Sequence, residues 1–203
     1  MLLAFDTSSA ACTAALFDGD GACIARADEV IGRGHSERLV PMLDELLDGR
    51  SADRILVGVG PGSFTGIRVG IAAAHGLAIG WGTELSGMSS LALLAAGAAA
   101  EAEVAACVIG GHGELFVQTF DASTLEPRSE LLNLPPAEAA MAVQAELVVG
   151  SGAGRLVEAR GRGEARDLWP SAINARKLPN ALRSLPATPV YARAPDARAK
   201  AAA

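Results

Sequence analysis

The chain has 203 residues, half of them apolar, and a formal net charge of −6 at pH 7. This size allows one large domain or two small ones around a packed core, and the negative charge argues against a free-standing nucleic-acid binder, which needs a clustered basic surface. Three cysteines without a Cys-x-x-Cys pair favour a reducing compartment. The segment Met1–Asp6 lacks the basic region of a signal peptide, and the longest apolar stretches fall short of the roughly 20 residues of a membrane span. We therefore expect a cytoplasmic protein without membrane contact.

The first third of the chain predicts three strands, at Leu2–Asp6, Thr13–Phe17 and Ala22–Asp28. The turn Asp18-Gly19-Asp20-Gly21 is typical of a hairpin, so the strands should pair antiparallel.

A helix should follow over Ser36–Leu47, because apolar residues recur at helical spacing. After it we expect a strand and two helices, at Ile55–Val59, Thr65 to about Ile79, and Ser89–Ala100.

The second half predicts a weaker repeat of the same element order. The expected strands are Val104–Ile109, Leu115–Phe120, Leu131–Leu134 and Leu147–Gly150, and the expected helices are Pro136 to about Glu146 and Arg155–Arg160. Repeats of one supersecondary unit indicate an internal duplication. We expect an N-terminal lobe over residues 1–100, a smaller C-terminal lobe over 101–191 and a disordered tail over 192–203, which has little apolar surface.

The resulting fold class is α/β, with two tandem βββαβα lobes of which the second is reduced. This is the plan of the actin-like ATPase and sugar-kinase superfamily (ASKHA, ribonuclease H-like), whose members bind nucleotide between the lobes. Fold-level analogy alone does not assign a function.

A glycine-rich turn, residues 60–66, separates an apolar strand from a helix. Such a turn presents backbone N–H groups and the positive end of the helix dipole to an anion, although neither a dinucleotide fingerprint nor a P-loop is present. The alternative is a plain turn whose glycines supply positive φ. A carboxylate and a hydroxyl end the first strand, where they would either hold a metal-bound phosphate or form an Asx turn. The candidate phosphate-binding residues are Asp6, Thr7, Gly60, Gly62, Ser63 and Thr65, with Thr65 also suited to cap the helix.

Small residues recur every three or four positions along the helix that follows. A glycine inside a helix costs about 1 kcal/mol relative to alanine, so a packing reason is needed. The neighbour that packs on this stripe could be internal, the default being the helix Ser36–Leu47, or another protein. The stripe consists of Gly66, Gly70, Ala73, Ala74 and Leu77.

Histidines and nucleophiles give no sign of a catalytic or metal site. His35 opens a helix beside the capping residue Ser36, and no His-x-x-x-His spacing is present. Ser63 lacks recognisable His and Asp partners, so peptidase activity ranks last among the hypotheses.

Four blocks in the first hundred residues together resemble the bacterial TsaB (YeaZ) family. They are Phe5-Asp6-Thr7-Ser8, the run from Gly34 to Met42, the run from Val57 to Gly70, and Ser86-Gly87-Met88-Ser89-Ser90-Leu91. Pro189-Val190-Tyr191-Ala192-Arg193 is similar to the family's C-terminal end.

The resemblance implies a non-catalytic subunit that supports the TsaD threonylcarbamoyltransferase in forming threonylcarbamoyladenosine next to the tRNA anticodon. It implies pairing with TsaD through the first two helices, recruitment of the small ATPase TsaE and indirect contact with tRNA, and it leaves open whether the isolated chain forms a homodimer. The expected partner interface is Leu39, Leu43, Leu46, Gly66, Gly70, Ala73, Ala74 and Leu77. No tightly bound cofactor is expected, while ATP or ADP could lie at the partner interface.

The second half departs from the family pattern. An Asp-Ala-Arg-type segment is common there, whereas this chain has Gly110-Gly111-His112-Gly113-Glu114. Since actin-like ATPases grip a metal-bound triphosphate between both lobes, independent ATP turnover is not expected. The alternative function is an active ATP-dependent phosphotransferase that uses Asp6 and the Gly60–Gly66 turn.

Overall fold

The computed structural model describes residues 1–100 and 102–191, which form two five-stranded sheets of the same topology. The first sheet has the order β3-β2-β1-β4-β5. Its strands are β1 (Leu2–Asp6), β2 (Ala11–Phe17), β3 (Cys23–Val30), β4 (Arg54–Gly58) and β5 (Glu84–Met88). Strand β1 pairs antiparallel with β2 and parallel with β4, with Phe5 opposite Ala14 and Val57.

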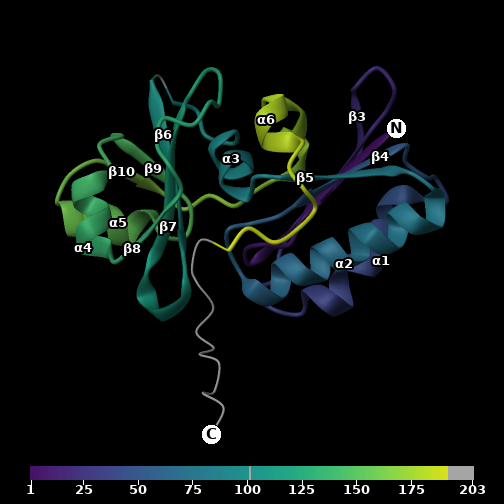
Figure 1. Ribbon diagram of the computed structural model, residues 1–203, viewed down its shortest axis with the longest axis horizontal. Helices are drawn as coiled ribbons and strands as arrows, with labels where there is room; N and C mark the ends of the chain where they lie inside the picture. Colours follow the sequence, from purple (N-terminus) through teal and green to yellow (C-terminus); the bar gives the residue numbers. More distant parts are fainter. Residues whose placement is uncertain (101, 192–203) are drawn as a thin grey trace, which may run out of the picture.

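Two long helices, α1 (His35–Leu47) and α2 (Phe64–Trp81), lie side by side on one face of this sheet (Figure 1). Alternate residues of the strands point toward them, because side chains in a strand alternate between faces. Leu3 and Phe5 of β1 therefore pack in one core with the apolar face of α1. Pro41 lies inside α1.

The second sheet has the order β10-β9-β6-β7-β8, which is the first order read from the other end. Its strands are β6 (Glu103–Ile109), β7 (Leu115–Asp121), β8 (Leu132–Leu134), β9 (Leu147–Val149) and β10 (Glu164–Arg166). Helices α4 (Pro136–Ala142) and α5 (Ala153–Arg160) cover its outer face around a small core. The predicted α/β fold with two βββαβα units is confirmed.

A short helix, α3 (Ser90–Ala95), lies between the two sheets (Figure 1). All six of its residues are buried, in a core that also takes Ala4 and Leu56 from the first sheet and Phe120 from the second. The helix ends at Ala95, five residues before the end that the sequence predicts.

Strands β5 and β10 are not predicted from the sequence, and neither are the short helices η1 (Gly111–Gly113), η2 (Ala172–Lys177) and α6 (Asn180–Arg183). Neither strand has the alternating apolar pattern of a half-buried strand, since β5 reads Glu-Leu-Ser-Gly-Met and β10 reads Glu-Ala-Arg. Both strands are held by parallel pairing to a well-buried neighbour, β4 and β9 respectively.

The chain returns to the first sheet after β10. The 3-10 helix η2 (Ala172–Lys177) is fixed there by a hydrogen bond of 2.8 Å from the Ala172 N–H to Thr13 Oγ1. Beyond α6 (Asn180–Arg183), Leu185 bridges to Gly87 at the edge of β5. This returning segment lies in the part that sequence grounds assign to the C-terminal lobe, yet its contacts are with the N-terminal sheet. The predicted tail over 192–203 lies outside the described residues.

Among the helices of residues 1–100 and 102–191, none combines the length and apolar character that crossing a bilayer requires.

Candidate functional site

A cleft of about 1210 Å³ opens between the two lobes. The first lobe contributes the β1–β2 turn and the starts of α1 and α2. The second lobe contributes residues 108–112, with Ser151 from the turn after β9, and Trp169 and Tyr191 complete the wall. The glycine-rich turn at residues 60–66, which follows β4, and the turn after β9 therefore contribute to one cleft, because β4 and β9 are equivalent strands of the duplicated unit.

The carboxylate of Asp6 is a buried structural group. Its Oδ1 accepts hydrogen bonds from the Ser8 N–H (2.8 Å) and the Ser8 hydroxyl (2.7 Å), and its Oδ2 accepts one from Ser90 Oγ (2.5 Å). Asp6 is fully buried, and a Cβ on Gly58 would lie 1.8 Å from its Oδ2. The strand end thus forms the Asx-type turn and uses both carboxylate oxygens within the chain.

Thr7 is buried as well and joins the turn to helix α2. Its hydroxyl donates to the Gly66 carbonyl at 2.7 Å. A Cβ on Gly66 would lie 2.0 Å from the Thr7 carbonyl oxygen, and one on Gly70 would lie 2.5 Å from Thr7 Oγ1. The first two glycines of α2 therefore allow the β1–β2 turn to approach the helix.

The start of α2 is capped by Ser63, whose Oγ accepts from the Gly66 N–H at 3.2 Å. The prediction that Thr65 caps the helix is wrong by two residues, because Phe64 already belongs to the first turn. Gly60 faces inward, with its N–H donating to Ser90 Oγ at 3.1 Å.

The phosphate-binding candidates therefore divide into two groups. Gly62, Ser63 and Thr65 line the cleft. Asp6, Thr7 and Gly60 are buried and do not line the cleft.

The actin-like fold implies a metal-bound nucleotide, and the residues present do not fit that group. The carboxylate at the end of β1 is held by Ser8 and Ser90 rather than free for a cation. Over residues 1–100 and 102–191, no cluster of three or more His, Cys, Asp or Glu side chains could hold a metal ion.

An aromatic and cationic cluster at the cleft is the part that sequence reasoning missed. The guanidinium carbon of Arg68 lies 3.6 Å from the centroid of the Phe64 ring, and Arg68 Nε donates to Tyr191 Oη at 3.0 Å. The two rings are 5.6 Å apart. Phe64 and Tyr191 are 127 residues apart in sequence, so their contact depends on how the chain returns to the first lobe. Arg68 and Tyr191 nevertheless lie in two of the segments that resemble the family.

Charged side chains on the cleft wall are mostly cationic. Arg33 and Arg68 line it, and within the described residues neither guanidinium has a carboxylate partner. The one carboxylate on the wall belongs to Glu37, whose pKa is lowered by the hydrogen bond from Ser36. His35 is buried, with Nε2 3.3 Å from the Ala11 carbonyl oxygen.

The fold buries most of the residues of the predicted partner interface. Six of its residues are buried in the chain's own core: Leu39, Leu43, Leu46, Gly66, Gly70 and Ala74. The remaining two, Ala73 and Leu77, are half-buried against that core. The neighbour of the α2 stripe is internal, but it is not the helix over 36–47 that was predicted as the default: Gly66 and Gly70 pack on Thr7 of the β1–β2 turn, and Gly70 also on Val57 of β4. A partner would therefore meet the outward faces of these helices.

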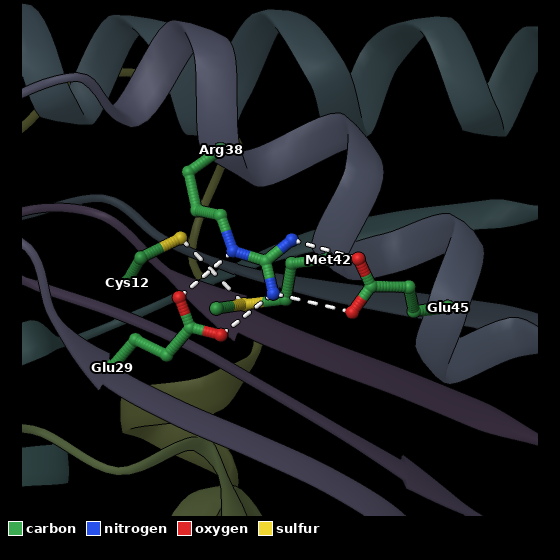
Figure 2. A network of polar contacts seen from close by, with 5 residues as sticks. All are labelled: Cys12, Glu29, Arg38, Met42 and Glu45. Carbon is green, nitrogen blue, oxygen red and sulfur yellow. Dashed lines mark hydrogen bonds and ion pairs between the residues drawn. The ribbon is translucent and has the colours of Figure 1, made fainter.

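A salt-bridge cluster on the side of α1 fixes this helix to β3 (Figure 2). Arg38 donates to both oxygens of Glu29, at 2.8 and 2.6 Å, and to Glu45 Oε1 at 3.0 Å. The hydrogen bonds from Arg38 lower the pKa of Glu29. Beneath this cluster the buried Cys12 thiol lies 3.7 Å from the sulfur of Met42 (Figure 2).

Comparisons with known proteins find similarity to proteins that are named for tRNA modification. The family model described as "TsaD: tRNA N6-adenosine threonylcarbamoyltransferase" matches residues 28–159. The TsaB protein of Escherichia coli K12, named a tRNA threonylcarbamoyladenosine biosynthesis protein, is 41% identical over 102 residues, which are 48% of this chain and 43% of that protein. The TsaB protein of Bacillus subtilis 168 is 36% identical over 100 residues, 47% of this chain and 43% of that protein. The matches thus span less than half the length of these curated relatives.

Solved structures extend the likeness over almost the whole chain. YeaZ from Pseudomonas aeruginosa is 32% identical with a TM-score of 0.78, covering 94% of this chain and 98% of that one. A second Pseudomonas aeruginosa structure, described as an uncharacterized protein with similarity to peptidase YEAZ, is 34% identical with a TM-score of 0.81, covering 95% and 99%. This likeness shows that the chain has the YeaZ fold over almost its whole length.

Proposed function

Because this chain belongs to the TsaB (YeaZ) family, we propose that it is a non-catalytic subunit that binds a TsaD paralogue and supports threonylcarbamoyladenosine formation in tRNA. TsaE remains a predicted further partner, and ATP or ADP at the subunit boundary remains a predicted ligand.

The geometry of the strand-end turn supports a non-catalytic role. In the competing hypothesis of an ATP-dependent phosphotransferase, Asp6 would have to reach a metal-bound phosphate. Its two oxygens instead accept three hydrogen bonds from Ser8 and Ser90 and are sealed from the cleft. Breaking these bonds would leave a buried carboxylate and its partners unsatisfied, which is costly.

The exposed face of α2 is the observation that carries the partner proposal. Ala72, Gly76 and Gly80 are exposed and recur every four residues, which aligns them along one side of the helix. A Cβ on Gly76 or Gly80 would meet no described heavy atom within 4 Å. Unlike Gly66 and Gly70, these two glycines have no internal packing reason for their cost of about 1 kcal/mol each.

Large apolar side chains are also exposed on α1 and α2. Ile79 of α2 is 82% exposed and Val40 of the neighbouring α1 is 62% exposed. Small residues let a second helix approach closely, while exposed aliphatic side chains gain energy from burial on association. We assign the exposed face of α2 formed by Ala72, Gly76 and Gly80 as the contact for a helix of the TsaD paralogue.

A bulky residue in this exposed face tests this assignment. Gly76→Leu should weaken binding to the TsaD homologue of the same organism at least tenfold, about 1.4 kcal/mol, because the new side chain stands where the partner helix would lie. Gly154→Leu is the matched control, since Gly154 is also an exposed helical glycine with no described atom near its Cβ, but on α5. Binding is measured by calorimetry, and threonylcarbamoyladenosine formation by mass spectrometry of tRNA.

The same variants address the alternatives. Equal TsaD binding by the wild type and Gly76→Leu would refute the assigned interface. If the isolated chain is a dimer that Gly76→Leu makes monomeric, the homodimer uses the same face and should be displaced by TsaD. ATP turnover by the isolated chain that Asp6→Ala abolishes would refute the non-catalytic role in favour of the phosphotransferase.

A further inference from the structure

Aromatic residues are concentrated in the cleft between the lobes. The chain has five Phe, two Trp and one Tyr, and four of these residues line the cleft: Phe64, Phe116, Trp169 and Tyr191. Phe64 and Tyr191 are 55% and 45% exposed. The chain has few aromatic side chains, yet two of its rings are exposed to solvent together in the cleft.

The exposed rings are held in a fixed arrangement by Arg68. Its guanidinium lies over the face of Phe64 and donates to the Tyr191 hydroxyl, while the Val190 N–H donates to the Val59 carbonyl at 2.8 Å. A rigid ring loses little conformational entropy when a ligand stacks on it. The cluster therefore holds two exposed rings in a fixed arrangement, tilted by 31° to each other, beside cationic charge.

The charge of the cleft wall differs in sign from that of the whole chain. Arg33 and Arg68 are present without carboxylate partners in the described residues, against the single carboxylate of Glu37. The net charge of the chain is −6. The cleft is thus locally suited to an anion, and the clustering of guanidinium groups next to aromatic faces is typical of sites that take a base and its phosphate.

The size of the cleft favours a polymer over a small ligand. Its volume of about 1210 Å³ exceeds the about 300–1,000 Å³ of ordinary small-molecule pockets. The carboxylate of Asp6 is already hydrogen-bonded to Ser90, which argues against a metal-chelated triphosphate in the cleft. Stacking and guanidinium contacts need no metal.

We propose that this cleft holds unpaired nucleotides of single-stranded RNA, with bases stacked on Phe64 and Tyr191 and phosphates at Arg33 and Arg68. The proposal rests on the proposed function, because the RNA is identified through the tRNA named for the relatives. It goes beyond that function in giving this subunit its own contact with RNA. The contact should be salt-dependent, since it neutralises phosphates.

The test uses a fluorescein-labelled RNA hairpin with an unpaired loop and a blunt RNA duplex of the same length. Anisotropy is measured with the chain alone and with its complex with the TsaD homologue. The hairpin should bind more tightly than the duplex. Tyr191→Ala should lower hairpin affinity roughly 5- to 100-fold, the value of one base stacked on an aromatic ring, whereas Tyr191→Phe should retain affinity because it keeps the ring.

Arginine variants test the cationic part. Arg33→Gln should weaken hairpin binding and reduce the slope of log K against log salt by roughly 0.7, the value for one phosphate of a single strand. Arg26→Gln is the matched control, because Arg26 is exposed on β3, outside the cleft lining, and likewise pairs with no described carboxylate. It should leave both the affinity and the slope unchanged.

Several outcomes would overturn the proposal. Equal affinity for hairpin and duplex, no loss in Tyr191→Ala, or saturable binding of adenosine monophosphate without hairpin binding would each do so. Measurements on the complex with TsaD distinguish failure of the RNA proposal from failure of the proposed function. A complex that forms normally with unaltered RNA affinity in the variants rejects the RNA contact alone, whereas a complex that never forms rejects the partner role.

Discussion

Two alanine substitutions in the same helix should change stability in opposite directions. Gly66→Ala places a Cβ 2.0 Å from the Thr7 carbonyl oxygen, a backbone atom fixed in the turn after β1. Gly76→Ala places one where no described heavy atom lies within 4 Å. Both gain helix propensity, about 1 kcal/mol, so the difference between them isolates the internal contact.

The magnitudes follow from these geometries. Gly76→Ala should raise the free energy of unfolding by about 1 kcal/mol, which shifts Tm upward by about 2–4 °C in a protein of this size. Gly66→Ala should lower it by about 1–3 kcal/mol, the usual cost of overpacking, because the turn or the helix must move. The loss is the net effect, since the contact outweighs the gain in propensity.

Urea unfolding followed by circular dichroism measures both variants. A Gly66→Ala protein as stable as the wild type would refute the conclusion that this glycine serves internal packing, and would return Gly66 to the partner interface. A destabilised Gly76→Ala protein would show that the exposed face of α2 is already covered within the chain.

Two further predictions concern titration and thiol reactivity. Hydrogen bonds from Ser123 and Arg128 hold the pKa of Asp121 far below its usual range, so this carboxylate stabilises the fold above its unfolded pKa of about 3.9. That contribution should disappear as pH falls below about 4, and Asp121→Asn should flatten the loss measured by acid titration of stability. Iodoacetamide at pH 8 should modify the exposed Cys23 in the native protein but spare the buried Cys12 and Cys107, because burial raises their pKa values to about 11 and about 12. Mass spectrometry before and after unfolding checks the sites, and early labelling of Cys107 would contradict its burial in the core that β6 shares with α5.

The parts of the candidate site that depend on neighbouring residues in the sequence were predictable. The parts that depend on contacts between distant segments of the chain were not. The turn at Gly62 and Ser63 faces the cleft as a strand-turn-helix pattern predicts. The burial of Asp6 could not be predicted, because its partner Ser90 is 84 residues away. The same holds for the pairing of Arg68 with Tyr191, 123 residues apart.

The sequence by itself determined the element order and the duplication, because apolar periodicity and glycine turns act over a few residues. Strand β1 begins and ends as predicted, and both lobes repeat one topology. Only the tertiary structure decided which face of α1 and α2 is available to a partner. A stripe of small and apolar residues indicates that a neighbour packs closely against it. At Leu39, Gly66 and Gly70 that neighbour is the first lobe of the chain itself. What remains open, at Gly76 and Gly80, depends on which side of α2 is turned away from the core, and no local pattern records this.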